Sequence, residues 1–212
     1  SGGLIAFFVG LVIIGGIKRI AAVASRLVPT MAVLYVAGAM LILLTHFENI
    51  IPSFASIFRE AFSLKAGWGG LITVIMWGVR RGLYSNEAGQ GSAPIAHAAA
   101  KTKESAREGA VALMGPFIDT IVVCTMTGLA ILSTGVLQST DLTGAQLTRE
   151  AFRNGSAFAP EIGSIIVNIA VLLFAYTTMV AWSYYGDRSI EYLVGPQAIK
   201  PYRWVYVFFN FM

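Results

Sequence analysis

The sequence contains few charged residues and a single cysteine. Lysine, arginine, aspartate and glutamate make up 12% of the 212 residues, whereas about a quarter of the residues in a soluble domain are charged. So small a share leaves too little polar surface to face water on all sides, and lipid must solvate much of the chain. Cys124 has no second cysteine to pair with, which excludes a disulfide framework. Its apolar neighbours indicate a small buried hydrophobe.

The sequence also lacks the motifs of common enzymes and nucleotide-binding proteins. Residues 67–70 read Gly-Trp-Gly-Gly, without the lysine and spacing of a phosphate-binding loop. Glu87 and His97 lie almost three helical turns apart, which argues against a catalytic pair at one membrane depth. The basic residues behind the net charge of +4 cluster in short segments between apolar runs, a pattern that indicates membrane orientation. We therefore expect no enzymatic activity, no cofactor and no nucleic acid partner.

What the sequence does contain is a series of apolar runs, each near the length of a membrane-spanning helix. Hydrophobic residues make up 56% of the chain, and its mean hydropathy is +0.71. We predict one all-α, polytopic transmembrane domain over residues 1–212. Its spans are expected at about residues 1–17, 27–45, 67–100, 109–134, 163–186 and 204–212. The first and last runs look incomplete, so the sequence is expected to be a fragment of a longer protein.

Two segments between the spans are expected to be helices outside the lipid core. Residues 46–66 are amphipathic, with Phe54, Phe58 and Phe62 at four-residue spacing, as in a helix that lies on the membrane surface. A short external helix is expected to start at Thr143. Pro29 would fall in the first turn of the span at 27–45, where proline is tolerated.

The basic residues predict the orientation of the spans. Alternating the loops places nine of them on one side, and the positive-inside rule makes that side cytoplasmic. These nine are Lys18, Arg19, Arg26, Lys101, Lys103, Arg107, Arg188, Lys200 and Arg203. The four on the other side are Arg59, Lys65, Arg149 and Arg153. The expected location is the plasma membrane, as the inner membrane of a bacterium or archaeon.

The region at 67–100 is interrupted near residues 82–94 by a polar, glycine-rich stretch, Gly-Leu-Tyr-Ser-Asn-Glu-Ala-Gly-Gln-Gly-Ser-Ala-Pro. In a continuous helix each glycine would cost about 1 kcal/mol and Pro94 about 3 kcal/mol relative to alanine. A helix break at membrane depth survives where its freed main-chain groups line a polar cavity. The two helix ends could then hold a carboxylate and a small cation. The alternative interpretation is an ordinary loop between two shorter helices.

Residues 82–94 resemble the signature of the alanine or glycine:cation symporter family, also called the sodium:alanine symporters. The similarity extends to residues 15–21, 117–125 and 173–182, so it covers essentially the whole chain. Tyr84 stands where phenylalanine is more frequent in the family. The resemblance implies a leucine-transporter-like bundle of two inverted five-helix repeats, each beginning with a broken helix. This chain would hold its fourth to ninth core helices, so the bundle would be partial.

The resemblance also implies a set of substrate-binding residues. Tyr84 and Ser85 would contact the substrate at the break, and Ala88 and Gly89 would be small to leave room for it, although close helix packing also explains small residues. Thr178 and Trp182 would lie beside the bound amino acid. Thr177 and Thr178 would offer hydroxyl ligands to sodium, the alternative being that both hydroxyls bond back to their own helix.

Four charged residues at membrane depth are expected to have structural or gating roles. Glu87 is expected to pair with Arg80 or Arg81, as a lock, a gate or a proton-linked group. Asp119 is expected either to bond to the interrupted region or to contact the cation, the first option being favoured. His97 is expected to be a helix-end residue, with a proton relay as the less favoured alternative.

The function implied by the resemblance is sodium-coupled symport of alanine or glycine across the plasma membrane, with a proton as the alternative coupling ion. The expected partners are the amino acid and the lipid bilayer. The alternatives from other classes are a membrane receptor that senses amino acids and an ion channel. A channel needs a continuous pore with charged rings, and the sequence shows no such pattern.

Overall fold

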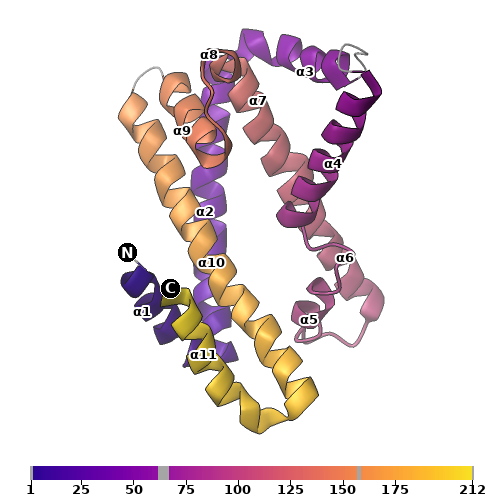
Figure 1. The fold of residues 1–212 in the computed structure, drawn as a ribbon, viewed down its shortest axis with the longest axis vertical. Coiled ribbons are helices and arrows are strands. Elements are labelled where there is room, and N and C mark those ends of the chain that lie inside the picture. Colours follow the sequence, from indigo (N-terminus) through magenta and orange to yellow (C-terminus); the bar gives the residue numbers. More distant parts are fainter. Residues whose placement is uncertain (1, 62–66, 157–158, 212) are drawn as a thin grey trace. The chain divides into compact units, whose positions relative to one another are not determined.

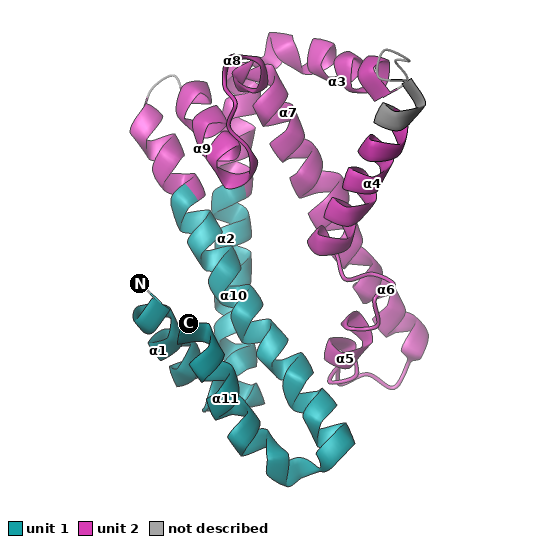
Figure 2. Ribbon diagram, viewed as in Figure 1, with its two compact units in different colours: residues 1–35, 168–212 teal, residues 36–167 magenta. Residues whose placement is uncertain are grey.

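The computed structural model describes residues 2–61, 67–156 and 159–211, and all of its regular elements are helices. Phe62 and Lys65 lie outside the described residues. The chain divides into two compact units (Figures 1 and 2): residues 1–35 with 168–212, and residues 36–167. Helices α2 (Ile17–Thr45) and α10 (Pro160–Val194) run through both units.

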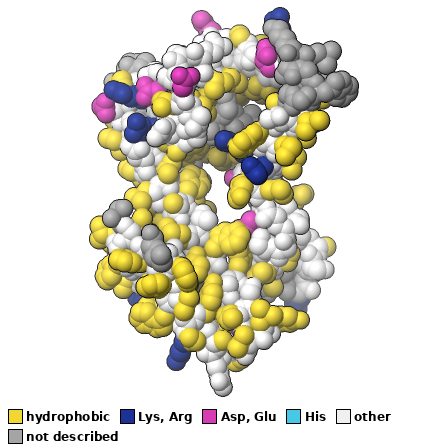
Figure 3. All heavy atoms as spheres, viewed as in Figure 1, with side chains coloured by type: hydrophobic (Ala, Val, Ile, Leu, Met, Phe, Trp, Pro, Cys, Tyr) yellow, Lys and Arg dark blue, Asp and Glu magenta, His cyan; other side chains and the backbone are white. Residues whose placement is uncertain are grey.

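Three helical runs are long and apolar enough to cross a membrane, among the residues that the structure describes. They are α2, the run Ser105–Ser133 and α10, and the apolar helix α1 (Gly2–Ile13) is shorter. Hydrophobic side chains cover much of the face shown in Figure 3, where charged side chains are few. The protein is therefore an all-helical membrane protein.

The first unit consists of α1, the start of α2, the end of α10, the short helix η3 (Pro196–Ala198) and α11 (Ile199–Phe211). Helix α1 packs beside α11 (Figure 1). Val12, Ile20 and Val180 form a buried cluster among the helices of this unit. The hydroxyl of Tyr176 donates to the carbonyl of Phe8 at 3.1 Å, and that of Tyr206 to the carbonyl of Met179 at 2.7 Å. Tyrosines therefore join helices at both contacts.

Helix α2 starts ten residues earlier than the predicted span at 27–45, so Lys18, Arg19 and Arg26 lie in a helix and not in a loop. Pro29 accordingly lies inside the helix. The Arg19 guanidinium donates to the carbonyl of Leu11 at 2.9 Å, near the end of α1. It thus satisfies a carbonyl that the end of a helix leaves free, which explains why a basic residue is placed in the first turn of α2.

Helix α10 has 35 residues, a length of about 50 Å, and exceeds the predicted span at 163–186 at both ends. Its last turns carry Asp187, which is fully buried and accepts two hydrogen bonds from Arg203 of α11, the shorter at 2.7 Å. Arg203 therefore pairs with a carboxylate, although the charge pattern had placed it among the loop charges. Helix α11 likewise begins at Ile199, before the predicted start at residue 204.

The second unit contains α3 (Phe47–Ala61), α4 (Gly67–Ser85), α5 (Ala93–His97) and α6 (Ser105–Pro116). It continues through the π-helix η2 (Phe117–Cys124), α7 (Thr125–Ser133), α8 (Val136–Ser139) and α9 (Gly144–Gly155). The expected surface helix is α3, and the external helix expected from Thr143 is α9. Phe152, Ile42 and Val136 are buried in this unit. Asn49 of α3 donates to the carbonyl of Ser133 at the end of α7, at 2.9 Å.

The packing of α9 against α10 predicts a strong effect of Gly163→Ala. A β-carbon at this position would overlap the main-chain oxygen of Phe152 and crowd the hydroxyl of Ser156. Overpacking of this kind costs about 1–3 kcal/mol, so we expect a clear fall in the thermal unfolding temperature. Gly128→Ala in α7 is the matched control, because a β-carbon there meets no other side chain or distant backbone within 4 Å. Equal unfolding temperatures for the two variants would contradict the close contact at Gly163.

Candidate functional site

The helix that begins at Gly67 ends at Ser85, and residues 86–92 are not helical. This interruption, called the break below, lies within the predicted stretch 82–94. Gly89 and Gly91 have φ angles of +81° and +88°, values that suit glycine and strain other residues. Helix α4 has 19 residues, about 28 Å, and α5 has five. The two helical pieces are therefore unequal in length.

Side chains of the break satisfy its own main-chain groups. The carboxamide oxygen of Asn86 accepts a hydrogen bond from the amide of Ala88 at 2.8 Å. The side-chain nitrogen of Gln90 donates to the carbonyls of Leu83 and Asn86, in the last turn of α4 and just beyond it. Such local bonds compete with helix formation, and here they hold the chain in its turned conformation. They explain the polar residues of the break without any ligand.

Asp119 joins the π-helix η2 to the last residue of α4. The hydroxyl of Ser85 donates to a carboxylate oxygen of Asp119 at 2.8 Å, and it lies 3.5 Å from the sulfur of Cys124. A bond from Asp119 to the edge of the break was the favoured option in the sequence. Cys124 is exposed, so the expectation of a buried hydrophobe is wrong: the π-helix presents this side chain toward the end of α4. The preceding Pro116 has no N–H to donate, and the wider turn starts directly after it.

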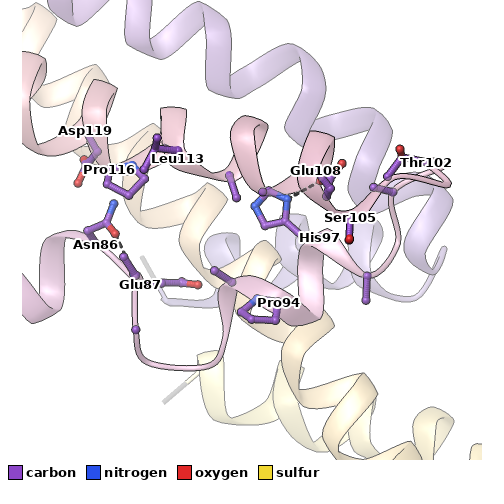
Figure 4. Close-up of a pocket in the computed structure, with 18 of the residues that line it drawn as sticks. Asn86, Glu87, Pro94, His97, Thr102, Ser105, Glu108, Leu113, Pro116 and Asp119 are labelled. Carbon is purple, nitrogen blue, oxygen red and sulfur yellow. Dashed lines mark hydrogen bonds and ion pairs between the residues drawn. The ribbon is translucent and has the colours of Figure 1, made fainter.

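A cavity of about 1000 Å³ lies between the break, α5, α6 and the start of η2 (Figure 4). Ser85, Ala88 and Gly89 line it together with Glu87 and Asp119. A β-carbon on Gly89 would meet nothing within 4 Å, so backbone conformation and not lack of space requires glycine there. His97 and Glu108 line another part of the cavity and contact each other. The cavity thus combines small residues with carboxylates.

Three predicted site residues on α4 lie outside this cavity. Tyr84 is 87% exposed. Arg80 and Arg81 both lie over the ring of Trp77, at 5.5 and 5.8 Å from its centre, as cation–π contacts. Among the described residues Glu87 forms no ion pair with either arginine, so the expected pairing is not present. Glu87 lies beyond the end of α4 and lines the cavity. The two arginines lie about one turn earlier, within the helix, and contact Trp77.

In the first unit, Thr178 and Trp182 line a second cavity, of about 490 Å³. Tyr185, Tyr202 and Tyr206 complete its aromatic wall, and the rings of Trp182 and Tyr185 meet edge to face at 5.8 Å.

The two threonines expected to bind sodium have different surroundings. Thr178 lines the aromatic cavity and donates its hydroxyl hydrogen to the carbonyl of Phe174 at 2.7 Å. Thr177 is buried, donates to the carbonyl of Leu173 at 2.8 Å and lies 3.7 Å from the sulfur of Met31. Both hydroxyls bond back to their own helix, as the alternative interpretation stated. A hydroxyl that donates in this way keeps its oxygen lone pairs for a cation.

Sequence reasoning missed three residue pairs or contacts: Asp187 with Arg203, His97 with Glu108, and the Gln90 bonds to the end of α4. The first two join residues on different helices, which no local pattern reveals. For Gln90, the sequence did offer a signal: a polar side chain between Gly89 and Gly91 can bond to the main chain of a turn.

Comparison with known proteins supports one family. The sequence profile described as "Sodium:alanine symporter family" matches residues 1–212. The chain is 48% identical to the sodium/alanine symporter AgcS of Methanococcus maripaludis, over 100% of this chain and 47% of that protein. It is 38% identical to the sodium/proton-dependent alanine carrier protein of Bacillus sp. strain PS3, over 87% of this chain and 44% of that protein.

A third relative, the probable sodium/glutamine symporter GlnT of Bacillus subtilis, is 37% identical over 90% of this chain and 39% of that protein. The chain thus spans less than half the length of these relatives. All three relatives carry transporter names and none carries an enzyme name.

The conformation of the break predicts opposite effects of two glycine substitutions. Gly82 and Gly89 both have open space where an added β-carbon would lie, but Gly82 is helical and Gly89 has φ of +81°. Gly89→Ala should therefore destabilise the protein by about 1–2 kcal/mol, whereas Gly82→Ala should be neutral or stabilising by up to about 1 kcal/mol. Thermal unfolding of the full-length protein measures both. A fall of the same size in both variants would mean that the left-handed conformation at Gly89 is not the cause.

Proposed function

Because the chain belongs to the sodium:alanine symporter family, we propose that it forms part of a secondary active transporter that couples sodium entry to uptake of alanine, and of glycine as a second substrate. The break in the helix after Ser85, with the cavity beside it, carries the proposal. At membrane depth such an interruption is tolerated where it is buried in protein or lines a water-filled cavity, and in transporters broken helices form the substrate and ion sites. The proposed location is the plasma membrane, and the proposed fold is a leucine-transporter-like bundle of which this chain supplies part.

Each unit carries residues that we propose as substrate contacts. Ser85, Ala88 and Gly89 would contact the amino acid at the break, with Tyr84 at the end of α4. The carbonyls at the end of this helix carry partial negative charge, which suits the substrate's ammonium group. In the first unit, Thr178 and Trp182 would offer the amino acid a hydroxyl and an aromatic wall in the cavity that they line. Small side chains at residues 88 and 89 would leave room for the substrate beside the break.

Sodium is the proposed coupling ion, and a proton is the alternative. The names of two relatives include sodium and alanine, and one of these also includes the proton. Sodium prefers hard oxygen ligands, such as hydroxyls and main-chain carbonyls. Thr178 meets this requirement at a cavity wall, and Thr177 beside it does so in a buried position. We propose Thr178 as the first of the two to test.

Whether sodium and alanine strengthen each other's binding tests the proposed coupling of sodium entry to alanine uptake. In the full-length protein, sodium should tighten alanine binding by roughly 5- to 150-fold, and alanine should tighten sodium binding by the same factor. Calorimetric titration of alanine in sodium and in potassium buffers measures this effect. Uptake into proteoliposomes, driven by an inward sodium gradient and competed with glycine or glutamine, measures transport and selectivity. An alanine affinity that does not change with sodium would refute coupled symport and favour a receptor or a channel.

Thr178→Val should raise the sodium concentration needed for half-maximal alanine binding by about tenfold, the effect of losing roughly 1.5 kcal/mol of interaction with a charged group. The substitution keeps the shape of the side chain and removes its oxygen. Thr148→Val on α9 is the matched control, because that hydroxyl is exposed and also bonds back to its own helix. If both variants behave alike, Thr178 is not a sodium ligand.

A further inference from the structure

His97 and Glu108 form a close contact at the cavity beside the break. The Nδ1 atom of His97, the last residue of α5, lies 2.6 Å from a carboxylate oxygen of Glu108 on α6 (Figure 4). The two side chains are 34% and 22% exposed, so water reaches the pair only in part. The proposed substrate contacts do not include either residue.

This contact holds a short helix whose other attachments are weak. Among the residues that the structure describes, no other side-chain hydrogen bond or ion pair joins α5 to α6. Upstream of α5 lie Gly89 and Gly91, both with positive φ, and downstream lies a non-helical segment, residues 98–104. A five-residue helix is not stable by itself. The position of α5 on α6 therefore depends strongly on this one pair.

Several charged side chains line the cavity besides His97. Glu108 faces the imidazole from α6, and the same cavity is lined by Glu87 of the break and Asp119 of η2. Lys103, from the segment before α6, is the one basic side chain besides His97 among the described residues that line it. Glu108 is the carboxylate in direct contact with His97. Asp119 is eleven residues from Glu108, about 16 Å along α6 and η2. Histidine is the side chain that ordinarily changes charge between about pH 5 and 8.

We propose that His97 and Glu108 form a proton-binding site, and that its occupancy controls how tightly α5 is held on α6. Proton binding gives the imidazole a positive charge, so its hydrogen bond to the Glu108 carboxylate becomes an ion pair and strengthens. By linkage, a proton that stabilises the docked position of α5 is itself bound more tightly in that position. Low pH therefore favours the docked half-helix and high pH releases it. The consequence for transport rests on the proposed function.

Hydrogen exchange tests the site without any transport measurement. In the full-length protein, the amides of residues 93–100 should become several-fold better protected between about pH 8 and pH 5.5, after correction for the intrinsic pH dependence of exchange. In His97→Gln, which keeps a hydrogen-bonding side chain but cannot titrate, the protection should not change with pH. His46→Gln is the matched control, because His46 is the other histidine of the sequence and follows the end of α2. Protection that is independent of pH in the unmodified protein would overturn the proposal.

Sodium-driven alanine uptake into proteoliposomes gives the second readout. At low pH the stronger contact between α5 and α6 would slow any transport step in which the two helices separate. The rate of uptake should therefore rise several-fold from about pH 5.5 to pH 8. His97→Gln should flatten this profile, and Glu108→Gln should move its midpoint to lower pH, because the carboxylate that favours the protonated imidazole is gone. A profile unchanged in both variants would refute the role in transport. If the unmodified protein takes up no alanine at any pH, the proposed function fails, and hydrogen exchange still decides the proton site.

Discussion

In the hydrocarbon interior of a membrane, every main-chain N–H and C=O group needs a partner, and a helix cannot supply one where it is interrupted. At residues 86–92 the chain leaves the helix, and Asn86 and Gln90 bond to the groups that the end of α4 would otherwise leave free. Asp119 takes the hydroxyl of Ser85 at the same point. The break is therefore held by three polar side chains, and it is built to persist with or without a ligand. A site formed in this way needs little reordering when a ligand binds, which lowers the entropic cost of binding.

The helix opposite the break is also irregular, and the two irregularities meet. The π-helix η2 begins directly after Pro116 and carries Asp119 in its first turn. A wider turn changes the direction in which the following side chains leave the helix axis, and such turns are frequent at functional sites. Here it brings both Asp119 and Cys124 within reach of the Ser85 hydroxyl. In the second unit the end of one helix and the deformation of another thus form a single polar contact beside the cavity.

The sequence predicted structure well where residues that disfavour a helix stand inside an apolar run. It did not predict contacts between side chains that are far apart along the chain. Three glycines and a proline inside an apolar run made the interruption visible, and its observed limits fall inside the predicted stretch. The spacing of Phe54 and Phe58 likewise indicated the helix that is observed as α3.

In contrast, the start of α2 was misplaced because basic residues were taken to end a helix, whereas Arg19 bonds to the end of α1 from within a helix. The pairs formed by Asp187 with Arg203 and by His97 with Glu108 depend on how helices pack, which hydrophobic periodicity does not encode. The predicted ion pair of Glu87 with Arg80 or Arg81 is also absent from the part of the chain that the structure describes. Residues that are close along the chain need not point toward one another when a helix ends between them.

The exposed surface of α4 adds a physical constraint on the arrangement of the complete protein. All the described side chains of this helix from residue 71 onward are exposed, including Arg80 and Arg81, whose contacts are with the face of Trp77. A cation–π contact is worth about 0.5–2 kcal/mol, less than the roughly 2.5 kcal/mol or more that an arginine costs at the centre of a bilayer. These two guanidinium groups therefore cannot face lipid at that depth on the strength of Trp77 alone. They therefore belong near the headgroups, or beside polar groups that offset the cost of burying their charge.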